Sequence, residues 1–112
     1  MVGEPDPDVL EVAVAAALAY VRGIDDRRVF PDAAAVEALA AFDEPLPEHG
    51  TDATDTLRLL DEIGGPATVA STGPTYFGFV TGGTHPAALG ASWLADAWDQ
   101  NAALPAMSPV AT

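Results

Sequence analysis

The side chain with the clearest capacity for acid–base chemistry is His85, because histidine gains and loses a proton near neutral pH. It stands in the sequence GGTHP, directly before Pro86. Proline favours the first position of a helix, so His85 is equally placed to cap or pack against a helix start. A small enzyme that uses His85 with Asp96 or Asp99 is conceivable on composition, but the structural role is favoured.

Asp96, Asp99 and Asn101 carry oxygen atoms of the kind that bind cations. The two aspartates are three residues apart and would share one face of a helix. No third carboxylate stands in register with them. The sequence therefore favours a solvated polar face, and we expect no metal site.

A second candidate for chemistry is the stretch GPTYFGFVTGG, residues 73–83, in which glycines alternate with aromatic residues. Glycine permits a close approach of the backbone to another group, and aromatic rings supply flat apolar walls. This pattern favours either a short buried strand between two turns or a loop that lines a ligand pocket. The simpler alternative is that the large aromatic residues are core, namely Phe77, Phe79, Trp93 and Trp98.

A helix is expected from Asp6-Pro7-Asp8 to Gly23, because an acidic cap and a proline open it and a glycine closes it. Its apolar residues recur at helical spacing: Leu10, Ala13, Val14, Ala17, Leu18 and Val21. Two interpretations stay open. The helix is either a core helix covered on most of its circumference or an arm that packs on another subunit.

Three further helices are expected over residues 32–42, 51–63 and from Pro86 to about Asn101. Asp52 is the expected N-cap of the second of these. The connector DDRR at residues 25–28 is interpreted as a solvated loop, and residues 44–50, which hold two prolines, as a linker. The sequence thus predicts a mainly α chain of about four helices plus a short aromatic strand or loop.

The charge balance narrows the possible partners. Seventeen acidic residues face four basic ones, for a net charge of −13, and there is no cysteine. Binding to nucleic acid or to an anionic membrane requires clustered basic residues, so we expect neither. No cleavage signal follows the acidic start MVGEPDPD, and we expect a cytoplasmic protein.

The segment TYFGFVTGGTHPAALGASWLADAWDQN, followed by SPVAT, resembles the N-terminal part of the group II pyridoxal-phosphate-dependent decarboxylases. This family includes the aromatic-L-amino-acid, histidine and glutamate decarboxylases. Its members carry a proline-glutamate loop (here Pro47–Gly50), a helix, an aromatic segment, a proline-led helix and a Ser-Pro-x-x-Thr element (here Ser108–Thr112). Order and spacing match over about Pro45 to Thr112.

The resemblance implies that residues 1–112 are the N-terminal helical segment of a larger α/β enzyme of fold type I, a homodimer. In this family the N-terminal helices wrap over the partner subunit. The parent would decarboxylate an amino acid with pyridoxal 5′-phosphate, and this segment would supply a substrate-pocket wall and dimer contacts.

By the same resemblance, Phe79, Val80 and Thr81 would face the substrate, with Thr81 as the hydrogen-bonding group. Gln100 and Asn101 would reach the pocket of the other subunit. Ala102-Ala103 stands where the aromatic-acid decarboxylases carry a large aromatic residue, which argues against an aromatic substrate.

The 112 residues contain no lysine, whereas a fold-type I enzyme needs one for its Schiff base. No catalytic, cofactor-binding or metal residue is therefore expected here. We expect the large cofactor-binding domain to lie outside these residues and the chain to be inactive alone. The alternative is a small acidic helical binding module that engages a partner protein through its aromatic cluster and first helix.

Overall fold

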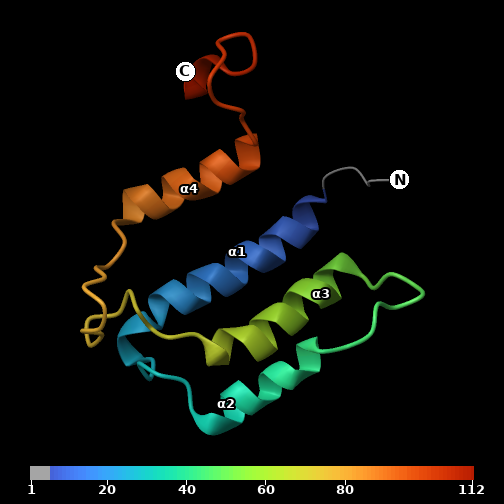
Figure 1. The fold of residues 1–112 in the computed structure, drawn as a ribbon, viewed down its shortest axis with the longest axis vertical. Coiled ribbons are helices and arrows are strands. Elements are labelled where there is room, and N and C mark those ends of the chain that lie inside the picture. Colours follow the sequence, from blue (N-terminus) through green and yellow to red (C-terminus); the bar gives the residue numbers. More distant parts are fainter. Residues whose placement is uncertain (1–5) are drawn as a thin grey trace. The chain divides into compact units, whose positions relative to one another are not determined.

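The computed structural model describes residues 6–112, and this part of the chain is helical with no strands (Figure 1). Residues 1–5, and with them part of the acidic start, lie outside the described residues. The chain divides into two compact units, one ending at Thr81 and the other running from Gly82 to Thr112. Each unit is described by itself.

Helix α1 (Pro7–Arg22) begins and ends where the sequence predicts. The carboxylate of Asp6 accepts a hydrogen bond from the amide of Asp8 at 3.0 Å, and Pro7 occupies the first helical position. These groups satisfy or remove amides that a helix start otherwise leaves unpaired. Gly23 ends the helix, and a 3₁₀ turn over Ile24–Asp26 follows.

Helices α2 (Ala33–Ala38) and α3 (Ala53–Leu59) also lie where they were predicted. Each is a short α-helix that continues as a 3₁₀ or π turn. Asp32 caps α2 and Asp52 caps α3, as expected for Asp52. A 3₁₀ turn over Leu39–Phe42 extends α2. A π turn over Leu60–Gly64 and a 3₁₀ turn over Gly65–Ala67 extend α3.

The three helices of the first unit lie side by side, with α3 between α1 and α2 (Figure 1). α1 and α3 run in the same direction, and α2 runs opposite to them. A single layer of helices can cover only part of each helix surface. Among residues 6–81 of the first unit, the one buried side chain is accordingly that of Ala70, so the apolar core is very small.

The predicted apolar stripe of α1 is only partly covered and holds no buried residue, so the interpretation of α1 as a core helix covered on most sides is wrong. Leu10 is 61% exposed, and Val14 and Val21 are also exposed. The half-buried residues of α1 are Val9, Val12, Ala13, Ala16, Ala17, Leu18 and Tyr20. One neighbouring helix, α3, covers only part of the α1 surface, so Leu10, Val14 and Val21 stay exposed.

The second unit contains α4 (Pro86–Trp98) and a C-terminal 3₁₀ turn over Pro109–Ala111. Asp99 ends α4 in a left-handed conformation with φ of 47°, so the helix stops earlier than the predicted Asn101. In the described part of the chain, no helix is both long enough and apolar enough to span a lipid bilayer.

Candidate functional site

The aromatic segment forms a tight turn over Gly78–Thr81 rather than a strand. The amide of Thr81 donates to the carbonyl oxygen of Gly78 at 3.3 Å. The two central residues, Phe79 and Val80, have φ angles of 54° and 58°. Positive φ at both central positions is the signature of a type I′ turn, which normally takes asparagine and glycine.

Phenylalanine and valine at these positions strain the turn. In the left-handed region Cβ crowds the following carbonyl oxygen, at a cost of roughly 1–2 kcal/mol per residue, and β-branched Val80 is the less tolerant residue. Such outliers gather at ligand-contact and switch regions because the strain persists only where something else selects it. The turn is therefore the strongest candidate site among the described residues.

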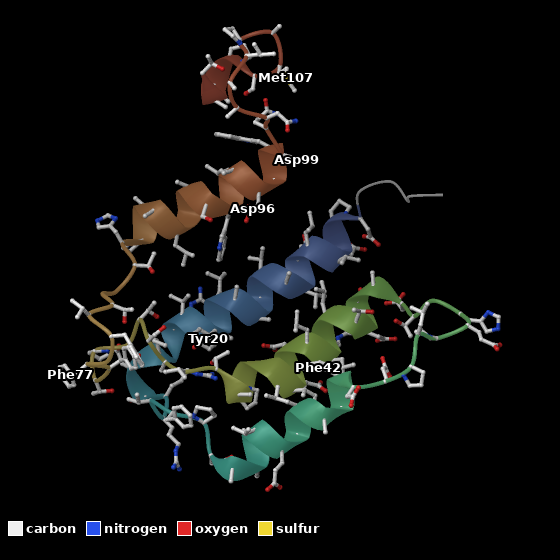
Figure 2. All side chains as sticks on the ribbon, viewed as in Figure 1. Tyr20, Phe42, Phe77, Asp96, Asp99 and Met107 are labelled. Atoms are coloured by element: carbon white, nitrogen blue, oxygen red, sulfur yellow. The ribbon has the colours of Figure 1, made fainter. Side chains whose placement is uncertain are left out.

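The apolar side chains of this turn, and that of Phe77 just before it, are almost fully exposed. Phe77 is 90% exposed, Phe79 93% and Val80 102%, and Figure 2 shows Phe77 projecting from the loop. The interpretations of Phe77 and Phe79 as core residues or as a buried strand are therefore wrong. Trp93 and Trp98 of α4 are also exposed, so the aromatic residues do not form a common core. A group of exposed apolar side chains marks a contact surface.

The base of the segment is fixed although its tip is exposed. The amide of Ala70 donates to the carbonyl oxygen of Val29 at 2.9 Å. The amide of Gly73 donates to the carbonyl oxygen of Ala70 at 3.1 Å. A Cβ on Gly73 would lie 3.3 Å from the carbonyl oxygen of Ile24. These backbone contacts thus fix the start of the segment at Ala70 and Gly73.

Gly78, the first residue of the turn, faces the ring of Tyr76. A Cβ added at Gly78 would lie 2.6 Å from the Tyr76 hydroxyl oxygen and 2.8 Å from the ring carbon that carries it. Only glycine fits while the ring keeps this position. The glycine at this position therefore lets the Tyr76 ring pack against the backbone at the start of the turn.

Thr81, the predicted hydrogen-bonding group, uses its hydroxyl within the turn. Its Oγ1 donates to the carbonyl oxygen of Gly78 at 3.3 Å. The hydroxyl oxygen keeps its acceptor capacity, because one donated bond leaves the lone pairs available. Thr81 can therefore accept a hydrogen bond from a ligand without opening the turn.

Gln100 and Asn101 lie just after α4 in the second unit, whereas Phe79, Val80 and Thr81 end the first. Both are exposed. The side-chain amide of Gln100 donates to the carbonyl oxygen of Trp98 at 2.7 Å and thus satisfies a C-terminal carbonyl of α4. Neither unit alone brings all five predicted substrate contacts together.

His85 caps α4: its Nδ1 accepts a hydrogen bond from the amide of Ala87 at 3.2 Å, and Pro86 holds the first helical position. Asp96 and Asp99 are exposed. Among residues 6–112, no three His, Cys, Asp or Glu side chains are placed to hold a metal ion.

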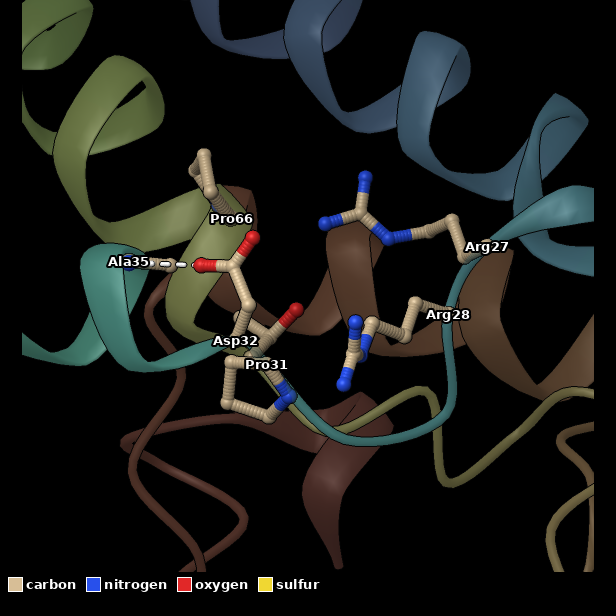
Figure 3. A pocket seen from close by; sticks show the side chains of 7 residues that line it. Arg27, Arg28, Pro31, Asp32, Ala35 and Pro66 are labelled. Atoms are coloured by element: carbon tan, nitrogen blue, oxygen red, sulfur yellow. Dashed lines mark hydrogen bonds between the residues drawn. The ribbon is translucent and has the colours of Figure 1, made fainter.

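A polar pocket in the first unit was missed by sequence reasoning. Arg27, in the connector interpreted as a solvated loop, is half-buried and donates to the carbonyl oxygen of Gly65. Arg27 and Arg28 line the pocket together with Asp32 (Figure 3). The available signal was the scarcity of basic residues: two of the four stand side by side.

Comparison with protein-family models, curated proteins and solved structures finds no match to this chain.

Proposed function

We propose that this chain is the N-terminal segment of a pyridoxal-phosphate-dependent amino-acid decarboxylase of group II. It supplies a wall of the substrate pocket and contacts to the partner subunit, and it is inactive in decarboxylation by itself. The observation that carries the proposal is the strained, exposed turn at Phe79-Val80. The turn falls where the family-like motif TYFGFVTGG places substrate contacts.

The energetics of the turn support a role in which another surface covers it. Leaving a large apolar side chain in water forfeits about 1.5–3 kcal/mol relative to burial. Phe79 and Val80 are exposed and also strained. The rest of the enzyme and the bound amino acid would remove this apolar surface from water, and the fixed base at Gly73 would position it.

The exposed stripe on α1 supports the subunit contact. Leu10, Val14 and Val21 present exposed apolar surface along one face of α1. Obligate subunit interfaces are the surfaces on which such side chains become buried. This fits the interpretation of α1 as an arm that packs on another subunit.

The residues of this chain do not fit the cofactor by themselves. The 112 residues contain no lysine, and pyridoxal phosphate is held in such enzymes through a Schiff base to lysine. No step of the reaction is therefore assigned to this chain. Its part is to bind, orient and enclose the substrate.

The first test is the coding sequence that follows the codon for Thr112. The proposal expects it to continue, in frame or after one frameshift, into a region that encodes a His-Lys pair. A stop codon with no such region nearby would overturn the proposal.

The second test uses the complete enzyme. Phe79→Ala should raise KM for the amino acid while the cofactor absorption stays unchanged, because the substituted side chain faces substrate and not cofactor. Phe77→Ala is the matched control, since it removes an equally exposed ring two residues away. Equal effects of both substitutions would argue against a substrate contact at Phe79.

The exposed aromatic residues also favour a second candidate, a small acidic binding module whose partner protein covers Phe77, Phe79 and Val80. The two candidates differ in the stability of the isolated chain. An arm that requires a partner subunit should unfold at low denaturant concentration. A monomer with a cooperative transition at several molar urea would favour the binding module.

A further inference from the structure

A small pocket opens in the first unit between the connector after α1 and the start of α2 (Figure 3). Its volume is about 160 Å³, smaller than the cavities of roughly 300–1,000 Å³ that hold drug-sized ligands. It therefore suits a molecule of a few heavy atoms. The pocket is lined by Arg27, Arg28, Pro31, Asp32, Ala35, Pro66 and Thr68.

Arg27 is held in position at the pocket. Its Nη2 donates to the carbonyl oxygen of Gly65 at 2.6 Å, and its guanidinium carbon lies 4.2 Å from the centre of the Tyr20 ring. The hydroxyls of Tyr20 and Thr68 share a hydrogen bond at 2.9 Å, which fixes the ring. A guanidinium oriented in this way keeps further N–H groups for a ligand.

Arg28 and Asp32 are also oriented by the backbone. Arg28 donates through Nε to the carbonyl oxygen of Phe30 at 2.9 Å, so its two terminal nitrogens stay available. Asp32 accepts through one carboxylate oxygen from the amide of Ala35 at 2.8 Å, drawn as the dashed line in Figure 3. Its second oxygen keeps its acceptor capacity.

These opposite charges line one pocket without touching. Within residues 6–112 the ion pair present joins Arg58 to Asp55, so no guanidinium nitrogen of Arg27 or Arg28 lies within 4.0 Å of the Asp32 carboxylate. Figure 3 shows both arginines on the side of the pocket opposite Asp32 and Pro66. The pocket therefore offers a cationic wall and an anionic wall with a gap between them.

We propose that this pocket binds a small zwitterion that carries a carboxylate and an ammonium group a few bonds apart. The carboxylate would accept from Arg28 and Arg27, since guanidinium groups bind carboxylates with paired, charge-assisted hydrogen bonds. The ammonium would donate to the open oxygen of Asp32. A simple anion would be repelled by the negative charge of Asp32. A simple cation would be repelled by the positive charges of Arg27 and Arg28.

The pocket shares no residue with the Phe79–Thr81 turn. This proposal is therefore independent of the proposed function, and either one can fail while the other holds.

The test is a titration of the 112-residue chain with glycine, followed by the backbone amide signals in NMR. Acetate and methylammonium, which carry the two charged groups of glycine separately, are titrated at the same ionic strength because salt screens such contacts. Glycine should shift the amides of Asp32, Ala35 and Thr68 saturably and bind about tenfold more tightly than either half, as expected when two charge-assisted contacts act together. Acetate binding as tightly as glycine, or no saturable shift, overturns the proposal.

Two substitutions test the two walls. Arg28→Gln and Asp32→Asn should each weaken glycine binding about tenfold, the loss expected for one hydrogen bond to a charged group. Asparagine caps a helix as well as aspartate, so Asp32→Asn removes the charge and keeps the α2 start. Arg22→Gln and Asp96→Asn are the controls, because both residues are exposed and outside the pocket. Tighter binding by Asp32→Asn would identify an anion site and overturn the zwitterion.

Discussion

The Nη2 atom of Arg27 donates a hydrogen bond of 2.6 Å to the carbonyl oxygen of Gly65, which lies 38 residues further along the chain. This contact joins the connector after α1 to the turn that ends the α3 segment. The Arg27 guanidinium also lies over the ring of Tyr20 in α1. In a unit whose apolar core is so small, one arginine side chain thus links two helices.

Arg27→Ala should lower the free energy of unfolding by about 1.5–3 kcal/mol, because it removes a charged hydrogen bond and the contact with the Tyr20 ring. Arg27→Lys should lose less, since it keeps the charge but not the planar group. Urea denaturation followed by circular dichroism measures both. Arg22→Ala is the control, because Arg22 is exposed at the end of α1. Equal stability of the Arg27→Ala and Arg22→Ala variants would contradict a linking role.

Replacing the strained pair at the turn with its preferred residues should stabilise the chain. The double substitution Phe79→Asn and Val80→Gly should raise the free energy of unfolding by about 1–2 kcal/mol, since asparagine and glycine tolerate positive φ. The shift of the urea midpoint measures the gain. Phe77→Asn should give no gain, because Phe77 is exposed but does not have positive φ. A loss of stability in the double variant would show that the turn is not strained.

Substitution by alanine should change the stability of the chain differently at two glycines of the aromatic segment. Gly73→Ala should destabilise by about 1–2 kcal/mol, because its Cβ would meet the carbonyl oxygens of Ala70 and Ile24 at 3.2 and 3.3 Å. Gly82→Ala should be neutral or stabilise by up to about 1 kcal/mol, since its Cβ would have no neighbour within 4 Å. Thermal unfolding midpoints compare the two variants. Equal unfolding midpoints for the two variants would show that a Cβ at Gly73 meets no obstacle.

Ser108→Ala should loosen the C-terminal 3₁₀ turn. Ser108 is fully buried, and its hydroxyl accepts from the amide of Ala111 at 3.3 Å, a cap whose loss costs about 1 kcal/mol. Hydrogen exchange at the Ala111 amide should become several-fold faster. Ser92→Ala in α4 is the matched control, because Ser92 is exposed. Unchanged exchange at Ala111 would rule out the cap.

Local sequence signals predicted the helices well. Caps and breakers such as Asp6 with Pro7, Asp52, and His85 with Pro86 act within one or two turns of backbone, so the sequence alone locates them. The C-terminal ends were less predictable. The π turn over Leu60–Gly64 and the left-handed Asp99 depend on how the chain must leave each helix.

The sequence by itself determined the helical class, the helix starts and the presence of one unusual aromatic, glycine-rich segment, because propensity, capping and periodicity are local properties. Only the tertiary structure decided what each apolar face contacts. Helical spacing marks Leu10 and Val14 as apolar positions, but whether they are covered depends on neighbours distant in sequence, and here both are exposed. The same holds for the pocket, because Arg27 and Thr68 meet only when α3 lies beside α1.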